Sequence, residues 1–241
     1  MAHSTGHILV VGASSGIGRA VAEHFAGQGS VVTALARRAD RLAELAEAGI
    51  ATVAADVTDL AAIGGVLQAA VAERGLLTGL VYCAGVQLIK PMRSLGVDEV
   101  ERLYKTNLVA PTLFAAAFGN ARISTRDAVF CAVSSVAAQR PEPAIVPYAA
   151  SKSGLDALIR GLARELAPRR AVGVAPGWLD TEMTQAHARL YGDDFKAALE
   201  KRSPAGAATV DSVVEAIAFL MSPQARHVTG EILRVDGGAT L

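Results

Sequence analysis

The feature of this sequence that most constrains its fold is the stretch GASSGIG (12–18), which directly follows the β-rich run HILVV (7–11). Its glycines, Gly12, Gly16 and Gly18, allow a tight turn and a close approach of the backbone to a pyrophosphate. The pyrophosphate would rest on the N-terminus of the helix expected over 17–28. The alternative is a turn that is rich in glycine for conformational reasons only. At the first strand-to-helix junction of an α/β chain, this loop predicts a dinucleotide-binding site.

Short β-rich runs alternate with helical patterns along the whole chain. The further strand-like runs are SVVTALA (30–36), ATVAA (51–55), GLVYCA (79–84), AVFCAV (128–133), AVGVA (171–175) and EILRV (231–235). Apolar residues recur with a helical period over 39–48, 59–73, 98–118 and 149–167. Repeated strand–helix–strand units imply a parallel sheet with right-handed crossovers. We therefore expect an α/β fold, a single doubly wound Rossmann domain over 1–241 with about seven parallel strands.

The composition agrees with such a sheet. Hydrophobic residues make up 51% of the chain and aromatic residues only 5%, so the core must be built from Ala, Val, Leu and Ile, as in strands covered on both faces. The formal net charge is zero, which indicates no nucleic-acid or anionic-membrane partner. No secretion signal or membrane-spanning apolar run is apparent, and we expect a cytoplasmic protein. Cys83 and Cys131 are expected as reduced core residues, with no disulfide and no metal site.

One longer polar stretch, 178–208, interrupts the alternation after the sixth strand. An insertion at the carboxyl edge of a parallel sheet is where a substrate lid would sit. We expect this segment, with Trp178, Met183 and Tyr191, to cover the substrate.

The end of the second strand indicates which dinucleotide is bound. An NAD site has an acidic residue near this point, which accepts hydrogen bonds from the ribose 2′-hydroxyl. Here the sequence has Ala36, Arg37 and Arg38, and an arginine suits a 2′-phosphate. These positions predict NADP; the alternative is that the arginines, Arg38 above all, are a solvated start of the next helix. Asp56 could accept a hydrogen bond from the adenine amino group or cap a helix, a role that we assign to Asp59.

Several motifs occur in a fixed order over nearly the whole chain. Gly12-x3-Gly16-x-Gly18 is followed by Asp56, Asn107, Ser135, Tyr148-x3-Lys152 and PGWLDT (176–181). Together they resemble the short-chain dehydrogenase/reductase family. The ending VTGEILRVDGG is similar to the 3-oxoacyl-[acyl-carrier-protein] reductase branch of that family.

The resemblance implies a set of site residues. Ser135 is preferred to Ser134 because the family's serine lies thirteen residues before its tyrosine. Thr181 matches the residue that contacts the nicotinamide carboxamide. The implied catalytic residues are Asn107, Ser135, Tyr148 and Lys152. The implied cofactor contacts are Gly12, Ser14, Ser15, Gly16, Ile17, Gly18, Arg37, Arg38, Asp56, Val57, Ala84, Gly85, Tyr148, Lys152, Pro176, Gly177, Leu179 and Thr181.

Two departures from the family pattern concern the cofactor side. Cys83 stands where the family has the second asparagine of NNAG, so a local hydrogen bond at the sheet edge would be missing. The stretch before APG is about two residues shorter than usual, which could shift the loop at 176–181. Neither departure removes a catalytic group.

The spacing of Tyr148 and Lys152 suits carbonyl reduction. It places both on one face in the first turn of a helix, although the pair alone could be a half-buried tyrosine beside a solvated lysine. Ketone reduction needs a proton on oxygen, and a phenol with its usual pKa of about 10 holds its proton too tightly, whereas a nearby ammonium lowers that pKa. By resemblance, Lys152 would also bind the nicotinamide ribose. Ser135 would hold the developing oxyanion, and Asn107 would hold a water that links Lys152 to solvent.

These features lead us to expect an NADPH-dependent carbonyl reductase of a 3-oxoacyl thioester or similar ketone, free or on an acyl carrier protein. The alternatives are a dehydrogenase or reductase of a small alcohol, sugar derivative or specialised metabolite, and a non-catalytic NADP-binding partner. A binding module would gain nothing from a tuned phenol, so the four polar residues argue against the latter.

Two further expectations concern partners. The resemblance implies a homotetramer or homodimer, with the helices at 98–118 and 149–167 paired across a two-fold axis and the C-terminal strand at a second interface. Four arginines could flank the site entrance and attract an acidic carrier protein, or could be ordinary solvated residues. They are Arg122, Arg126, Arg169 and Arg170.

Overall fold

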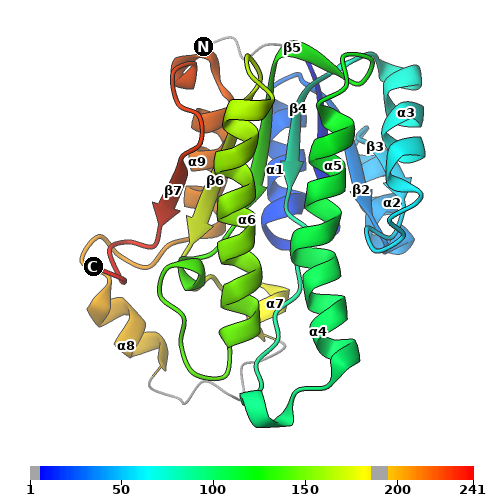
Figure 1. Ribbon diagram of the computed structural model, residues 1–241. Coiled ribbons are helices and arrows are strands. Elements are labelled where there is room, and N and C mark those ends of the chain that lie inside the picture. Colours follow the sequence, from blue (N-terminus) through cyan, green and yellow to red (C-terminus); the bar gives the residue numbers. More distant parts are fainter. Residues whose placement is uncertain (1–5, 186–194) are drawn as a thin grey trace.

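The computed structural model of the protein describes residues 6–185 and 195–241. Within these residues seven parallel strands form one open sheet in the order β3-β2-β1-β4-β5-β6-β7 (Figure 1). The chain builds outward from β1 to β3, returns to β4 beside β1, and then continues to β7 at the other edge. The expected doubly wound α/β sheet is confirmed.

All seven expected strands are present, with small shifts of their ends. They are β1 (His7–Val11), β2 (Val31–Ala36), β3 (Ala51–Ala54), β4 (Leu77–Tyr82), β5 (Ser124–Val133), β6 (Arg170–Pro176) and β7 (Ile232–Val235). The largest shift is in β5, which begins at Ser124 because its polar first residues continue the strand ahead of the apolar run.

The helices follow the expected pattern with two differences. They are α1 (Gly16–Gly27), α2 (Ala39–Glu47), α3 (Ile63–Arg74), α4 (Val97–Tyr104), α5 (Ala110–Phe118), α6 (Val146–Glu165), α7 (Glu182–Gln185), α8 (Phe195–Arg202) and α9 (Val210–Met221). A π-helical turn, Lys105–Val109, divides the helix expected over 98–118 into α4 and α5. Because α3 begins only at Ile63, the assignment of Asp59 as its cap is wrong.

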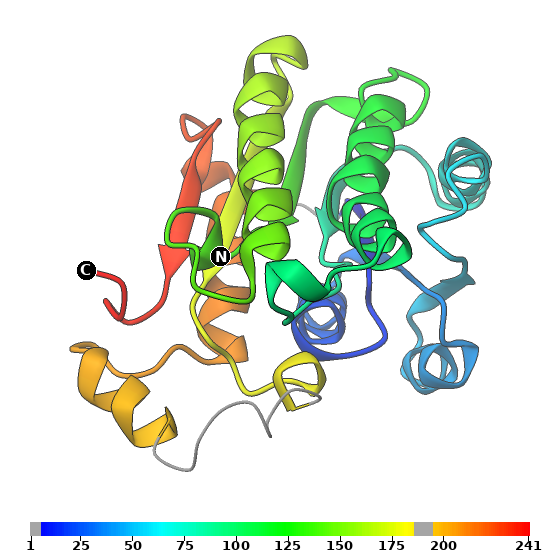
Figure 2. The same cartoon turned by 60° about the horizontal axis from the view of Figure 1, so that its bottom comes forward.

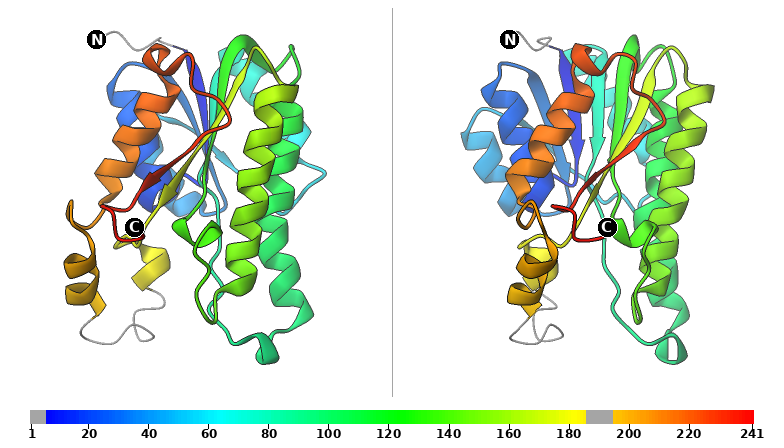
Figure 3. Two further views of the ribbon diagram at one scale, coloured as in Figure 1. Left: turned by 60° about the vertical axis from the view of Figure 1, so that its left-hand side comes forward. Right: turned by 90° about the vertical axis from the view of Figure 1, so that its left-hand side faces the viewer.

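The sheet separates two apolar layers, which Figure 3 shows from the side. On β1, Ile8 and Val10 pack with the layer of α1, α2 and α9, whereas Leu9 and Val11 pack with the layer of α3, α5 and α6. This alternation follows from the two-residue period of a strand. Helices therefore cover both faces, and the two ends of the sheet remain as the places where the chain can form a site.

The carboxyl ends of the strands point to the end of the molecule that faces the viewer in Figure 2, where α7 and α8 lie. The strand order reverses between β1 and β4, and in open α/β sheets ligands bind in the crevice at such a reversal. At this end Pro176 of β6 pairs with Val235 of β7, and β6 keeps one register with β5 throughout. The shorter stretch before APG therefore leaves no break in these pairings, and the loop after Pro176 starts from a strand in register.

In the part of the chain that the structure describes, no helix has the length and apolar character needed to cross a bilayer.

Candidate active site

A pocket of about 890 Å³ opens at the carboxyl ends of the strands. Every residue that the sequence assigned to the cofactor lines it, from the glycine loop through the ends of β2 and β3 to the loop after β6. Ser135, Tyr148 and Lys152 line it as well, whereas Asn107 lies behind the wall. The structure therefore brings together residues that are spread from position 12 to position 181 of the sequence.

The glycine loop forms the floor of the pocket. Gly12 has a φ of +88°, and a Cβ at this position would lie 2.5 Å from the main-chain nitrogen of Ala84. A Cβ on Gly18 would overlap the carbonyl oxygen of Gly12. Ser15 precedes α1, and its side chain does not cap the helix. The loop thus lies close against Cys83 and Ala84, which follow the end of β4, and it leaves the N-terminus of α1 open, which fits a pyrophosphate.

Cys83 lies beneath this loop. Its side chain packs against the α1 side of the core, and a Cβ on Gly18 would be 3.1 Å from its Cβ. Burial raises the pKa of the thiol well above its usual range, so the group is neutral. Cys83 therefore supplies an apolar contact where the family asparagine would supply polar groups.

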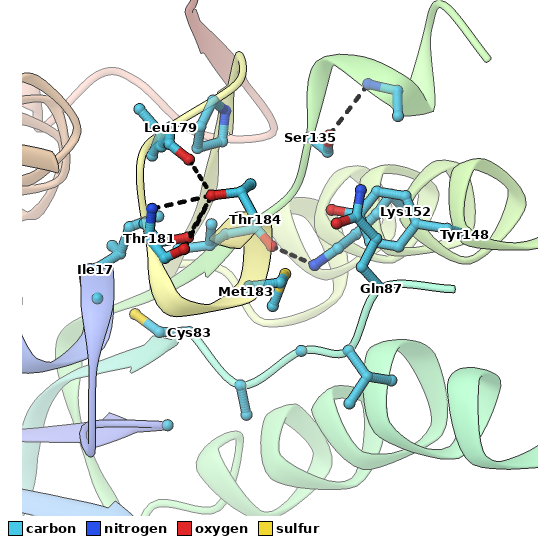
Figure 4. Close-up of a pocket in the computed structure, with 18 of the residues that line it drawn as sticks. Ile17, Cys83, Gln87, Ser135, Tyr148, Lys152, Leu179, Thr181, Met183 and Thr184 are labelled. Atoms are coloured by element: carbon cyan, nitrogen blue, oxygen red, sulfur yellow. Dashed lines mark hydrogen bonds between the residues drawn. The ribbon is translucent and has the colours of Figure 1, made fainter. Parts of the chain in front are cut away.

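Tyr148 and Lys152 lie on α6 and are both buried. Lys152 Nζ donates a hydrogen bond to the carbonyl oxygen of Val133 at 2.8 Å and lies 5.9 Å from the centre of the Tyr148 ring. Burial lowers the pKa of Lys152 to about 8. Figure 4 shows both side chains directed into the pocket, with Ser135 on the facing strand end.

Two serines follow β5, and their hydroxyl groups have different partners. Ser134 donates to the Asp156 carboxylate in a buried hydrogen bond of 2.5 Å. Ser135 precedes a short 3₁₀ turn, Val136–Ala138, and its Oγ accepts from the Ala137 nitrogen at 3.2 Å, which leaves its own proton to donate. Burial raises the pKa of Asp156. The sequence analysis did not single out this residue, and its one signal in the sequence is its position four residues after Lys152 on α6.

Asn107 is fully buried in the π-helical turn. Its Oδ1 accepts from the Val86 nitrogen at 2.9 Å, and its Nδ2 donates to the Val86 carbonyl at 2.9 Å and to Ser151 Oγ at 3.1 Å. A Cβ on Gly85 would lie 3.5 Å from Asn107 Oδ1 and 3.6 Å from Lys152 Nζ, so the two side chains approach one point of the pocket wall. The amide is occupied by protein groups, so a water at Asn107 would need its main-chain carbonyl.

Two arginines at the end of β2 take different positions. Arg37 Nη1 lies 3.8 Å from Asp56 Oδ2. Partial burial favours a higher pKa for Asp56, but two hydrogen bonds from Thr58 and the charge of Arg37 outweigh it and hold that pKa low.

Arg38 is bound to the glycine loop. Its Nη2 donates to Ser14 Oγ at 3.0 Å and to Ser15 Oγ at 2.7 Å, and its Nη1 donates to Glu182 Oε2 at 2.8 Å. Arg38 is therefore held at the pocket wall by these bonds, but it also directly precedes α2 and its side chain remains 42% exposed, so its contact with a cofactor stays a prediction. Glu182 was missed by sequence reasoning, because its partner lies 144 positions away.

Gln87 is a second pocket residue that the sequence did not single out. It lies beside Tyr148 and Lys152 in Figure 4, and its Oε1 is buried with no hydrogen-bond partner among the described residues. A polar atom in this state is costly unless a ligand or water satisfies it.

The segment expected as a lid contributes to the pocket from both of its described parts. Trp178 and Met183 line one side, and Leu199 and Arg202 of α8 line the mouth. Tyr191, the third residue assigned to the lid, lies outside the described residues.

The four arginines assigned to a carrier-binding patch lie at the other end of the sheet. Arg122 and Arg126 are near the start of β5, and Arg169 and Arg170 are at the start of β6. Starts of parallel strands face away from the pocket at their carboxyl ends, so the proposed patch at the entrance is wrong. In 6–185 and 195–241 no three His, Cys, Asp or Glu side chains are placed to hold a metal ion.

Comparison with known proteins identifies the family. A family model described as enoyl-(acyl carrier protein) reductase matches residues 12–240. The 3-oxoacyl-[acyl-carrier-protein] reductase of Escherichia coli (strain K12) is 34% identical over 236 residues, 95% of each chain. Gluconate 5-dehydrogenase of Gluconobacter oxydans (strain 621H) is 32% identical over 244 residues, 97% of this chain and 94% of that one.

Among solved structures, a short chain dehydrogenase from Burkholderia cenocepacia J2315 in complex with NADP is similar over 100% of both chains, with a TM-score of 0.89 and 28% identity. The relatives differ in the substrate that their names give, so they agree on a reaction class only. The chain belongs to the short-chain dehydrogenase/reductase family, whose oxidoreductases act on CH–OH and C=O groups with NAD(P).

Proposed function

We propose that this protein is an NADPH-dependent carbonyl reductase that converts a 3-oxoacyl thioester or a similar ketone to the secondary alcohol. The observation that carries the proposal is the buried pair of Tyr148 and Lys152 on α6, facing Ser135 across one pocket. The relative named as a 3-oxoacyl-[acyl-carrier-protein] reductase supports this substrate class. The gluconate dehydrogenase supports the alternative, a reductase of a small alcohol or sugar derivative.

The proposed roles follow from the groups that face the pocket. When bound, the nicotinamide would supply the hydride for the carbonyl carbon. Tyr148 would donate its phenolic proton to the ketone oxygen, and Ser135 would hold that oxygen while negative charge develops on it. Lys152, already desolvated and with a pKa near 8, would bind a ribose hydroxyl and favour the phenolate left on Tyr148.

Proton return to Tyr148 needs a path to solvent. We propose that Lys152 passes the proton on and that the main-chain carbonyl of Asn107 holds the next water. The support is the approach of Asn107 and Lys152 to the same point beside Gly85, and the occupation of the Asn107 amide by Val86 and Ser151. Asn107 is thus proposed as a positioning residue whose side chain fixes the turn.

The preference for NADPH is proposed from the polar groups at the end of β2. Ala36 offers no carboxylate for a ribose 2′-hydroxyl, whereas Arg37, Arg38 and the hydroxyl groups of Ser14 and Ser15 offer donors for a phosphate. A direct fluorescence titration should give at least about tenfold tighter binding of NADPH than NADH, since charge-assisted hydrogen bonds are worth about 1.5–3 kcal/mol. Equal affinities would refute this preference.

The substrate class is tested by NADPH oxidation with a matched panel. The panel contains a 3-oxoacyl thioester, a short free ketone of the same chain length, and an oxo sugar acid. Turnover that is highest for the thioester supports the proposal, and turnover that is highest for the sugar acid supports the alternative. Tight NADPH binding with no turnover of any carbonyl compound would instead indicate the non-catalytic partner.

We also propose a closed homo-oligomer with the segment 178–208 as the lid of each subunit. Val109 and Leu113 near the start of α5 are about two-fifths exposed (40% and 37%), and Leu233 on the edge strand β7 is exposed to 37%. Apolar surface near the start of α5 and on an edge strand suits two symmetric interfaces. Light scattering that gives a monomer at micromolar concentration would contradict the assembly.

A further inference from the structure

One ion pair joins the two sides of the pocket. Arg38, just after β2, donates to Glu182, the first residue of α7, with 2.8 Å between Nη1 and Oε2. Arg41 Nη2 adds a second cation 3.6 Å from Glu182 Oε1. Both side chains of the main pair line the pocket and are about half exposed, at 42% and 48%.

The donors in this pair are those that the proposed NADPH site would use. The guanidinium of Arg38 donates through Nη2 to Ser14 and Ser15 of the glycine loop and through Nη1 to Glu182. A phosphate at this place would compete with the Glu182 carboxylate for the same N–H groups, because both are anions matched to a guanidinium. It would also be repelled by the carboxylate for as long as the pair remained intact.

We propose that Glu182 is a specificity-determining residue that competes with the cofactor's 2′-phosphate for Arg38. The inference rests on the proposed NADPH site. Without cofactor, Glu182 neutralises Arg38 and ties α7 to the end of β2. A 2′-phosphate displaces the carboxylate and frees α7, whereas a dinucleotide without that phosphate leaves the pair in place. Binding of the 2′-phosphate would therefore release the contact that holds α7, the start of the segment expected as a lid, to the end of β2.

A simple latch would behave differently. If the Arg38–Glu182 pair closed over any bound dinucleotide, breaking it would weaken every adenosine ligand. Competition predicts the opposite sign, because removal of the Glu182 charge frees Arg38 for the phosphate. The two cases are distinguished by ligands that differ only in the 2′-phosphate.

The test measures binding of adenosine 2′,5′-bisphosphate and adenosine 5′-monophosphate by calorimetry to the full-length protein and to Glu182→Gln. Exposed ion pairs are worth up to about 1 kcal/mol, so the variant should bind the bisphosphate roughly two- to fivefold more tightly and the monophosphate unchanged. Weaker binding of both ligands, or no change for the bisphosphate, would overturn the proposal. Glu23→Gln is the matched control: Glu23 forms an ion pair of 2.8 Å with Arg19, is 48% exposed like Glu182, and does not line the pocket.

A second variant separates competition from long-range repulsion. In an Arg38→Gln background, Glu182→Gln should no longer tighten the bisphosphate, because the shared partner is gone. A gain that persists in that background would show that the carboxylate acts through its field alone and would overturn the proposal. If the unmodified protein binds the bisphosphate no better than the monophosphate, the NADPH site itself fails and this inference with it. Wild-type selectivity without a gain in Glu182→Gln overturns the inference only.

Discussion

The two ends of the same sheet use cationic side chains in opposite ways. At the amino end, Arg170 Nη1 donates to the carbonyl oxygens of Leu220 and Val228 at 2.8 and 3.1 Å, and its Nη2 donates to that of Ser222 at 3.2 Å. At the carboxyl end, Lys152 donates to Val133 within the described residues and has two further N–H groups. Arg170 thus donates its hydrogen bonds to main-chain carbonyls, whereas Lys152 has N–H groups with which it could bind a ligand.

The same contrast holds for the neighbours of these residues. Arg169 donates to Ser124 Oγ at 2.8 Å and to its carbonyl at 3.0 Å, and so fixes the turn between α6 and β6 to the start of β5. Arg38 at the other end binds side chains that line the pocket. Residue type and burial are thus poor guides to the role of a cationic side chain. The groups that accept its hydrogen bonds indicate whether it stabilises the fold or belongs to a binding site.

The largest expected effect is on catalysis at the carboxyl end of the sheet, where Tyr148 is the proposed general acid. Tyr148→Phe keeps the ring but removes the transferable proton, so kcat for ketone reduction should fall by at least the ~10²–10⁴ that general acid catalysis contributes. NADPH binding, measured by fluorescence titration, should be nearly unchanged. A variant that keeps most of the wild-type kcat would show that Tyr148 is not the acid.

The next effect is a pH dependence of cofactor binding. Because burial lowers the pKa of Lys152 to about 8, its ammonium loses a proton as the pH rises through that value, and its charge-assisted hydrogen bond is lost with it. NADPH affinity should therefore fall by roughly ten- to 30-fold between pH 7 and 9.5, which corresponds to about 1.4–2 kcal/mol and is the most that one group with a pKa near 8 can contribute over this range. Lys152→Ala should bind weakly with no such fall, whereas Tyr148→Phe should keep the wild-type profile. A flat wild-type titration would contradict this role for Lys152.

The sequence predicted the parts of this site that depend on order along the chain. Gly12, Asp56, Ser135 and Thr181 follow strands whose carboxyl ends share one edge, so their meeting in one pocket follows from the topology. The same reasoning, applied to Arg170, would have placed it at the opposite edge, because it stands at the start of its strand. The error about the carrier patch came from judging the arginines as charges near helix ends without using strand direction.

The parts that could not be predicted depend on contacts between distant segments. Asp156 gains its role from Ser134, 22 positions away, and Glu182 gains its role from Arg38, 144 positions away. Nothing in the local pattern distinguishes Glu182 from a solvated carboxylate, and the one signal for Asp156 is its position four residues after Lys152. The π-helical turn around Asn107 has the same origin: its sequence, KTNLV, fits an ordinary helix, and only the bonds to Val86 and Ser151 identify it as special.

At the amino end we predict a change in stability without a change in activity. Arg170→Met keeps most of the aliphatic stem but leaves the carbonyls of Leu220, Ser222 and Val228 without their donor, which should lower the free energy of unfolding by about 1–3 kcal/mol in urea denaturation. The kcat at 25 °C should remain near the wild-type value. Arg126→Met is the control, because Arg126 is exposed near the start of β5 and should have little effect on stability. A loss of kcat in a folded Arg170→Met protein would break the separation between the two ends.

The smallest expected effect is a pH dependence of stability that originates at His7. His7 is buried at the start of β1, where Nδ1 donates to the Gly75 carbonyl at 2.8 Å and Nε2 lies 2.9 Å from Thr33 Oγ1. Burial lowers the pKa of His7 below its usual 6.5. As the pH falls below about 6.5, the unfolded chain therefore takes up a proton at His7 before the folded protein does. The free energy of unfolding thus decreases toward acid pH, and this residue leaves it unaffected above that range.

One proton limits this slope to about 1.4 kcal/mol per pH unit. Urea denaturation between pH 7 and pH 5 should show a shallower pH dependence for His7→Gln than for the wild-type protein, because glutamine can donate to Gly75 but does not titrate. Replacing the exposed His227 by Gln should leave the wild-type slope in place. Because His7 lies at the end of the sheet away from the pocket, NADPH affinity at neutral pH should be the same in all three proteins, and a parallel change in affinity would show that the two ends of the sheet are coupled.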